Sequence, residues 1–176
     1  MTLRMSCVLA LGAWLSAAAC GQATEEYRVK AAFLYNFPKF VEWPGRAFKG
    51  PADPCTICVL GKNFFGDALS EAVSGRLVEG RPYSILQVAD VQQARFCHIL
   101  FISSSERKRL RSILDAVRGT GTLTVGDTEE FAEEGGVINF KNQGGNIRLE
   151  INVTAAAEQQ LRISSKLLSL AEIVKK

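Results

Sequence analysis

The sequence predicts an α/β fold, in which a single domain is built on a mixed, mostly parallel β-sheet of about five to six strands flanked by helices. Three observations favour this class. Several short, continuous apolar runs end at glycine or serine, as expected of strands that are buried on both faces. Segments with helical spacing alternate with these runs. A chain of 176 residues that is 47% apolar also has room for one domain with a real core.

The first element of the predicted domain is an aromatic helix over residues 27–44. Its apolar side chains cover most of the helix circumference, so we expect the helix to be largely buried. Pro38 removes one helical hydrogen bond and should kink the helix or end its regular part, and Pro44 stops it. The central stripe consists of Val29, Ala32, Phe33, Asn36, Phe37 and Phe40, which Tyr27, Ala31, Leu34 and Val41 widen.

The remaining elements alternate between strands and helices. Because about 14 helical residues separate the strand over 97–102 from the strand over 123–125, these two strands form a βαβ unit and should be parallel. Serines after residue 102 supply the N-cap of the helix between them. In chain order, the predicted segments are a strand over 56–61, a helix over 64–73, strands over 83–88 and 97–102, a helix over 103–118, a strand over 123–125, a hairpin over 137–153 and a helical region over 154–173, broken near 163–165.

Residues 1–23 have the pattern of an export leader. Arg4 supplies a basic start, and the apolar run over residues 5–15 is shorter than the about 20 residues that span a bilayer. Small residues at Gly21 and Ala23 favour cleavage before Thr24, which leaves residues 24–176 as the domain and predicts periplasmic export.

A lipoprotein pathway is the alternative for this leader. The tetrapeptide at residues 17–20, Ala-Ala-Ala-Cys, resembles a bacterial lipoprotein box with alanine in place of the usual leucine. In that case Cys20 would be the acylated N-terminus and the domain would be lipid-anchored. Both routes export the domain.

The charge pattern argues against a nucleic-acid partner. The formal net charge is only +3 at pH 7, which is too weak to indicate a nucleic-acid surface, and no RNA-binding aromatic motif is present.

Three cysteines remain after a leader that carries Cys7 and Cys20, and spacing permits any pairing among them. We favour a disulfide between Cys58 and Cys97, because both lie on neighbouring apolar strands of an exported domain. A thioredoxin-like role for Cys55 and Cys58 is disfavoured because a strand, not a helix, follows the motif. Zinc is disfavoured because the adjacent residues Cys97 and His98 would point to opposite faces of a strand. We therefore predict no metal or other cofactor.

No catalytic constellation emerges from the sequence. The only histidine, His98, falls in a predicted strand, no G-x-S-x-G motif is present, and the acids over 127–134 have the pattern of a solvated turn. We predict that the chain is not an enzyme.

A small-ligand site is one hypothesis that the predicted sheet supports. In open parallel sheets, ligands bind beyond the carboxyl ends of the strands. N-caps and turns explain the same residue types equally well. The polar residues at these ends are Lys62, Asn63, Ser103, Ser104 and Asp127.

Several segments resemble the YfiR family of exported bacterial proteins. They run in order through nearly the whole mature domain. The segments are KAAFLYNFPKFVEWP (30–44), ICVLG (57–61), CHILFIS (97–103), LTVGD (123–127), GGVINF (135–140), IRLEIN (147–152) and ISSKLLSLA (163–171).

The resemblance implies a non-enzymatic, redox-sensitive periplasmic regulator, expected to be a homodimer. Such proteins repress a membrane diguanylate cyclase through its periplasmic domain, and so control cyclic-di-GMP signalling and biofilm formation. An outer-membrane lipoprotein sequesters them. Cys58 and Cys97 match the positions of a family disulfide, whereas a second family disulfide has no counterpart because no cysteine follows Cys97.

The aromatic helix is densest in matching residues, so we predict that its exposed part, Tyr35, Asn36, Lys39 and Trp43, binds the partner. A periplasmic small-ligand binding module that serves a sensor kinase or a transporter is the alternative function.

Overall fold

The computed structural model describes residues 15–175, with side chains from Glu25 onward. Its first helix, α1 (Leu15–Asn36), runs through the predicted cleavage point before Thr24. Residues 1–14 and the side chain of Cys20 lie outside this description, so leader removal and lipidation stay predictions. Within residues 15–175, no helix is both long and apolar enough to cross a membrane.

An eight-stranded sheet forms the centre of the domain, with the strand order β10-β8-β7-β6-β5-β2-β4-β3. The five strands β7, β6, β5, β2 and β4 are parallel to one another. At one end of this group β8 pairs antiparallel to β7, and at the other end β3 pairs antiparallel to β4. The outermost strand, β10, is parallel to β8. The strands are β2 (Cys55–Leu60), β3 (Leu77–Val78), β4 (Arg81–Val88), β5 (Ile99–Ile102), β6 (Leu123–Gly126), β7 (Ile138–Gln143), β8 (Asn146–Asn152) and β10 (Ala171–Val174). The predicted mixed, mostly parallel α/β sheet is confirmed, with more strands than expected.

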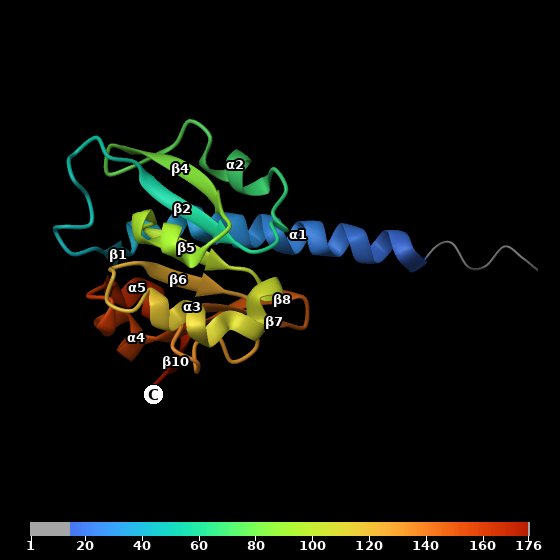
Figure 1. The fold of residues 1–176 in the computed structure, drawn as a ribbon. Helices are drawn as coiled ribbons and strands as arrows, with labels where there is room; N and C mark the ends of the chain where they lie inside the picture. Colours follow the sequence, from blue (N-terminus) through green and yellow to red (C-terminus); the bar gives the residue numbers. More distant parts are fainter. Residues whose placement is uncertain (1–14, 176) are drawn as a thin grey trace, which may run out of the picture.

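Helices cover both faces of this sheet, with α1 on one side and α3 on the other (Figure 1). A separate two-stranded ladder pairs β1 (Val41–Glu42) with β9 (Arg162–Ile163). The remaining helices are α2 (Ala68–Val73), α3 (Leu110–Ala116), α4 (Val153–Glu158) and α5 (Ser165–Leu168), and the 3-10 turns are η1 (Phe37–Lys39), η2 (Val91–Phe96) and η3 (Ser104–Arg109).

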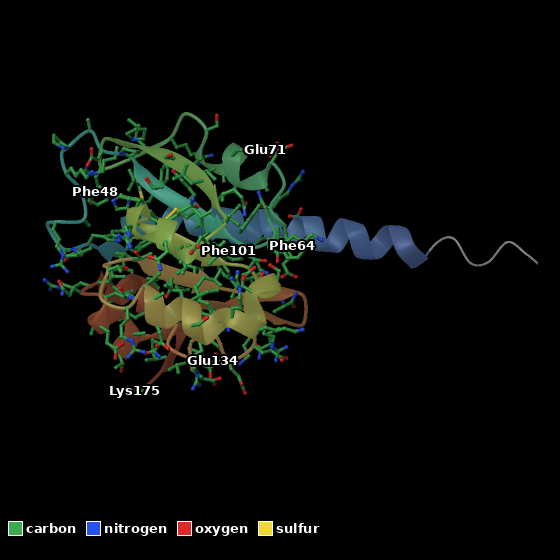
Figure 2. All side chains as sticks on the ribbon, viewed as in Figure 1. Phe48, Phe64, Glu71, Phe101, Glu134 and Lys175 are labelled. Carbon is green, nitrogen blue, oxygen red and sulfur yellow. A yellow bond between two sulfur atoms is a disulfide. The ribbon has the colours of Figure 1, made fainter. Side chains whose placement is uncertain are left out.

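Alternation along β2 divides the core into two clusters. Ile57 and Val59 face the α1 side, where Leu34 and Phe37 are also fully buried. Cys58 and Leu60 face the α3 side, with Leu110, Ile113 and Phe131. Every residue of β2 is buried, as expected for an interior strand of a sheet that is covered on both faces. Figure 2 shows the side chains on the ribbon, with Phe101 of the neighbouring strand β5 labelled inside the domain.

Pro38 ends the regular part of the first helix, as its missing N–H group predicts. The α-helix stops at Asn36, and Pro38 lies in the following 3-10 turn. The buried stripe, however, runs through Ala31, Leu34 and Phe37 rather than through Val29, which is 38% exposed. The prediction centred the stripe on the large side chains of Phe33 and Phe40, but both of these are only partly buried and pack against the edge of the core.

The predicted helical region over 154–173 forms the two helices α4 and α5 with a break between them, as expected, but it is wrong at residues 171–173, which belong to β10. The break follows the end of α4, where Gln160 has a φ of +59° and the chain enters β9. Farther on, Ile173 pairs in parallel with Ile151 of β8. Leucines at helical spacing extended the predicted helix to residue 173, but the β-branched residues Ile173 and Val174 instead supply an edge strand.

Candidate functional site

The carboxyl ends of the parallel strands meet at one edge of the sheet. From β4 to β7, the parallel strands follow the order 2-1-3-4-5, so the chain reverses its direction of travel between β2 and β5. Open α/β sheets bind ligands at such a reversal. The structure brings Lys62 and Asn63 after β2, Ser103 and Ser104 after β5, and Asp127 after β6 to this edge.

Helix α1 covers part of this edge with a buried polar network centred on Asp127. Its Oδ2 atom accepts a hydrogen bond from the Tyr27 hydroxyl at 2.6 Å and lies 2.7 Å from the Lys30 ammonium. The Ser104 backbone N–H donates to Oδ1 at 3.1 Å. Lys30 also pairs with Glu26 at 2.6 Å. The network therefore ties α1 to the ends of two central strands.

Burial and neighbouring charges perturb the titrating groups of this network. Burial, followed by the hydrogen bond to Asp127, raises the pKa of the Tyr27 phenol. Burial also works to raise the pKa of Glu26, but the hydrogen bond and charge of Lys30 outweigh it and hold that pKa below the usual value. The Tyr27 phenol thus stays protonated and the Glu26 carboxylate stays ionised near neutral pH, as their hydrogen bonds require.

The other residues predicted for a small ligand have partners within the chain. The backbone N–H of Lys62 donates to the Ser105 hydroxyl, and Asn63 accepts from the backbone of Phe65 in an Asx turn. Ser103 is fully buried, where its hydroxyl accepts the N-cap bond from the Ser105 backbone. Asp127, one of the predicted five, also lines a cavity, with Thr128 and Glu130. Turn and cap chemistry accounts for their positions.

Three of the four predicted partner-binding residues lie together at the end of α1. The Lys39 ammonium donates to the Tyr35 hydroxyl at 3.0 Å and to Asn36 Oδ1 at 2.9 Å. It lies 4.1 Å from the centre of the Tyr35 ring, and the guanidinium of Arg76 lies 4.7 Å from the same ring. Tyr83 supports the cluster from β4, since its hydroxyl donates to the Tyr35 carbonyl at 2.8 Å.

This cluster carries positive charge without an acidic member. Hydrogen bonds from Lys39 and Arg76 lower the pKa of the Tyr35 phenol. Among residues 25–175, neither Lys39 nor Arg76 forms an ion pair. Arg76 was missed from the sequence, because it follows α2 and only the tertiary fold brings it to α1. We call Tyr35, Asn36, Lys39 and Arg76 the cationic tyrosine cluster.

Trp43 lies apart from the cationic tyrosine cluster. It packs edge-on against Phe48 and His98 and lines a cavity of about 420 Å³ with Cys55 and Arg81. Its indole N–H is buried and has no hydrogen-bond partner among the described residues. Its ring contacts are thus with Phe48 and His98 rather than with Tyr35, and its role in partner binding stays a prediction.

Cys58 and Cys97 form a disulfide with a Cα–Cα distance of 5.8 Å. Cys55 is a free thiol on the opposite face of β2, where burial raises its pKa to about 12. A protonated, buried thiol is a poor nucleophile, which argues against disulfide exchange between Cys55 and Cys58. Within the described residues, no three His, Cys, Asp or Glu side chains converge as a metal site would require.

His98 serves as a structural hydrogen-bonding residue. Its Nδ1 atom accepts from the Thr56 backbone N–H at 3.0 Å, and its Nε2 atom lies 3.0 Å from the Ala47 carbonyl. The ring also stacks on Phe48 with the centroids 4.1 Å apart. His98 therefore pins the loop over residues 45–54 to the amino ends of the strands, and burial lowers its pKa.

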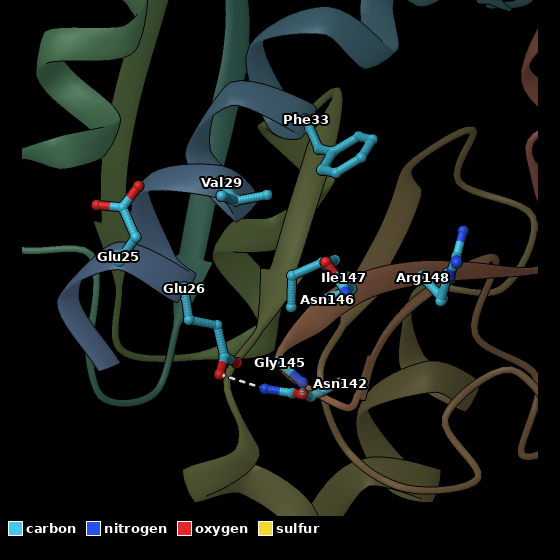
Figure 3. A pocket seen from close by; sticks show the side chains of 9 residues that line it. All are labelled: Glu25, Glu26, Val29, Phe33, Asn142, Gly145, Asn146, Ile147 and Arg148. Carbon is cyan, nitrogen blue, oxygen red and sulfur yellow. Dashed lines mark hydrogen bonds between the residues drawn. The ribbon is translucent and has the colours of Figure 1, made fainter. Parts of the chain in front are cut away.

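A groove that sequence analysis did not anticipate lies between α1 and the β7–β8 hairpin (Figure 3). It has a volume of about 460 Å³ and an apolar floor of Val29, Phe33 and Ile147. Glu26 crosses one end and accepts a hydrogen bond from Asn142 at 2.8 Å. The groove depends on a contact between residues 116 positions apart, which no local sequence pattern reveals.

Solved structures share this fold. A conserved domain protein from Vibrio cholerae O1 biovar El Tor matches with a TM-score of 0.57 and 14% identity, over 85% of this chain and 60% of that one. An ABC domain from Streptococcus pneumonia, solved in complex with L-Trp, matches with a TM-score of 0.51 and 10% identity, over 68% of this chain and 55% of that one. The chain therefore spans less than two thirds of either structure. No curated protein sequence matches it.

A family model described as YfiR/HmsC-like matches residues 27–172. The match begins at Tyr27 of the buried network and ends at residue 172 within β10, so it includes the other seven strands of the sheet and the whole cationic tyrosine cluster. In broad terms this family supports a regulatory role rather than a catalytic one. The chain belongs to the YfiR/HmsC-like family.

Proposed function

We propose that this chain is an exported, non-enzymatic regulator that binds the periplasmic domain of a membrane diguanylate cyclase and represses cyclic-di-GMP signalling. The family match over residues 27–172 carries this proposal. The disulfide between Cys58 and Cys97 adds support, because such bonds persist in oxidising compartments such as the periplasm.

The cationic tyrosine cluster is the proposed partner-binding surface. It offers an aromatic ring that two cations contact, and tyrosine and arginine are enriched where protein interfaces gain most of their binding energy. Because Lys39 and Arg76 have no carboxylate partner among the described residues, an acidic segment of the partner would complete the pairing. Leu77, which follows Arg76 and is 59% exposed, adds apolar surface beside the cluster.

Repression requires differential binding. The regulator must hold the inactive state of its partner more tightly than the active state, by a few kcal/mol, to bias a two-state switch. A preformed cluster suits this task, because side chains that are already ordered lose less entropy on binding.

Co-purification of the full chain from detergent-solubilised membranes tests the proposal. We expect recovery of a membrane protein with a periplasmic domain, at a defined stoichiometry. Replacing both cations (Lys39→Gln with Arg76→Gln) should abolish that recovery while the melting temperature stays within a few degrees of the wild type. Arg111→Gln, at an exposed position on α3, is the matched control and should retain the partner. Recovery of no membrane protein, or equal recovery with the double variant, would contradict the proposal.

The partner set also includes a sensor kinase in place of the cyclase, an outer-membrane lipoprotein as antagonist, and a second copy of the chain in a homodimer. Identification of the recovered proteins by mass spectrometry separates the first two. Light scattering of the purified chain measures the third directly.

A periplasmic small-ligand binding module is the second candidate, and the strand order favours it, because the chain reverses at β2 and β5. Thermal-shift measurements with nucleotides, amino acids and vitamins test it, because a ligand that binds only the native state raises the melting temperature. Absence of any shift at saturating concentrations would remove this candidate.

A further inference from the structure

The outer edge of β4 is open along most of its length. On its inner side, β4 pairs with β2 over residues 83–88. On its outer side, β3 pairs only with Arg81 and Pro82 at the start of the strand. No other strand of the described residues continues the sheet beyond this point, and Figure 1 shows β4 at the upper border of the sheet.

Alternation along β4 determines which backbone groups are directed outward. The turn between β3 and β4 has positive φ angles at Glu79 and Gly80, as in a type I′ hairpin, so Arg81 directs its N–H and C=O groups toward β3. Because these directions alternate along a strand, the backbone groups of Tyr83, Ile85 and Gln87 are directed to the same outer side. None of them has a hydrogen-bond partner among the described residues. An added strand would therefore find an open ladder.

This edge lacks the features that protect ordinary edge strands. Exposed edges are usually blunted by charge, proline or a bulge, because an unpaired ladder otherwise pairs with another chain. Residues 83–88, Tyr-Ser-Ile-Leu-Gln-Val, carry no charge and no proline, and Leu86 is 44% exposed. The strand at the other end of the sheet, β10, contains Glu172 and is followed directly by Lys175. The sheet is thus protected by charge at one end and open to pairing at the other.

We propose that a second copy of the chain pairs antiparallel with this edge, about a two-fold axis at Leu86. Such pairing would form the homodimer included in the proposed function, and so rests on that part of it. A two-fold axis normal to the sheet places one residue opposite its own counterpart. With the axis at Ile85, Val88 of the second copy would meet Pro82, where β3 already lies. With the axis at Leu86, it meets Ser84, which gives the longest pairing that avoids β3.

Pairing about Leu86 also satisfies the open ladder. Ile85 of each copy would lie opposite Gln87 of the other, and the two residues would exchange both backbone hydrogen bonds. The two Leu86 side chains would meet at the axis in a non-hydrogen-bonded position, where opposed side chains are closest. The exposed leucine would thereby be covered by its own counterpart.

Charges at the two ends of this pairing are complementary. Because Leu77 pairs with Pro82, Arg76 is the next residue in line, at the head of the open edge. After β4 the chain bends at Ala89 and Asp90, so Asp90 of the second copy would arrive beside Arg76. Neither residue forms an ion pair within the described part of the chain. Two symmetric pairs between Arg76 and Asp90 would therefore complete the interface.

Light scattering of the purified full chain across a dilution series tests the proposal. We expect a dimer that dissociates on dilution. Leu86→Lys should abolish the dimer, because two like charges would meet at the axis. Leu170→Lys is the matched control and should leave the dimer intact, since this leucine is 71% exposed and lies next to β10 at the other end of the sheet.

A second pair of variants isolates the backbone contact. Gln87→Pro removes an outward N–H group and keeps the ladder with β2, and edge strands tolerate proline at such a position. Gln87→Ala keeps the N–H group, and both variants lose the side-chain hydrogen bond to the Gly61 carbonyl. The dissociation constant of the dimer should rise at least about tenfold for Gln87→Pro and stay within about twofold for Gln87→Ala. Matching circular dichroism spectra verify that both variants are folded.

A chain that is monomeric at every concentration would overturn the proposal, as would Leu86→Lys or Gln87→Pro variants that dimerise like the wild type. Co-purification from membranes with Gln87→Pro separates the dimer from the regulator function. Loss of the dimer with retained recovery of the membrane protein supports a second copy on β4. If the wild type is monomeric and Gln87→Pro loses the membrane protein, the edge binds that protein instead. If the wild type recovers no membrane protein, the regulator function fails, and the dimer measurements still decide what pairs with β4.

Discussion

The ammonium nitrogen of Lys30 lies 2.7 Å from Oδ2 of Asp127, and the two side chains are only 3% and 4% exposed. One comes from α1 and the other from the carboxyl end of β6, 97 residues later in the chain. This pair therefore joins the first helix to the centre of the sheet at the edge where related folds bind ligands. Its burial makes it sensitive to the loss of either partner.

Lys30→Met should lower the free energy of unfolding by about 3 to 5 kcal/mol, because it leaves the carboxylate of Asp127 buried without its cation. Urea denaturation measures the change. Arg107→Ala is the control, since it breaks the exposed pair with Glu129 and should cost less than about 1 kcal/mol. Equal losses in the two variants would show that the Lys30 pair has no special weight.

The pH dependence of stability should include a contribution from His98. Its folded pKa is depressed by burial, so below the unfolded value of about 6.5 the unfolded chain binds a proton that the folded chain resists. The stability is therefore complete above about pH 6.5 and falls as the pH decreases below it. Protonation of Nδ1 would also remove the acceptor of the hydrogen bond from the Thr56 backbone N–H, because both atoms would then carry hydrogen.

His98→Gln removes this contribution. We expect the free energy of unfolding of the variant to change less between pH 7.5 and pH 5.5 than that of the wild type, measured by urea titration at each pH. A variant with lower stability but the same pH dependence would mean that other groups cause the acid sensitivity.

Much of the fold could be predicted because it depends on local patterns. The continuous apolar runs at β2 and β5 identified buried parallel strands, and Pro38 marked the end of α1. The Cys58–Cys97 pairing followed from two neighbouring strands in an exported domain. In these cases the local signal and the tertiary environment agree.

The candidate sites were harder to predict, because they depend on contacts between distant parts of the chain. Arg76 joins Tyr35 only through the packing of α2 on α1, and Trp43 is directed elsewhere by Phe48 and His98. Serine and asparagine are common at strand ends both in ligand-binding sites and in turns and helix caps, so their presence in the sequence does not distinguish the two roles. The edge strand β10 was missed because a four-residue strand gives a weaker signal than leucines at helical spacing.

The disulfide should contribute strongly to stability. It closes a separation of 39 residues, for which the chain-entropy model gives about 4 kcal/mol. Replacing Cys58 and Cys97 together by alanine should therefore lower the free energy of unfolding by about 2 to 4 kcal/mol in guanidinium denaturation. Cys55→Ala is the control and should cost less, because it breaks no cross-link.

Cys55 should resist alkylation in the folded protein at pH 8, because its thiol is fully buried and its pKa is raised to about 12. Peptide mapping after iodoacetamide treatment measures the modification at this residue. It should become modified only in denaturant. Rapid modification of the native chain would show that β2 opens locally or that the thiol is reactive, and would restore a redox role to the Cys55-x-x-Cys58 motif.

Gly126→Ala should destabilise the domain by about 1 to 3 kcal/mol, because the added Cβ atom would lie 2.3 Å from the ring of Phe131 and would force that side chain or the strand to move. The loss of thermal stability measures this cost. Gly50→Ala is the matched control, since an added Cβ at Gly50 meets nothing within 4 Å. Equal thermal stability of the two variants would contradict the prediction, because it would mean that the ring of Phe131 moves aside without cost.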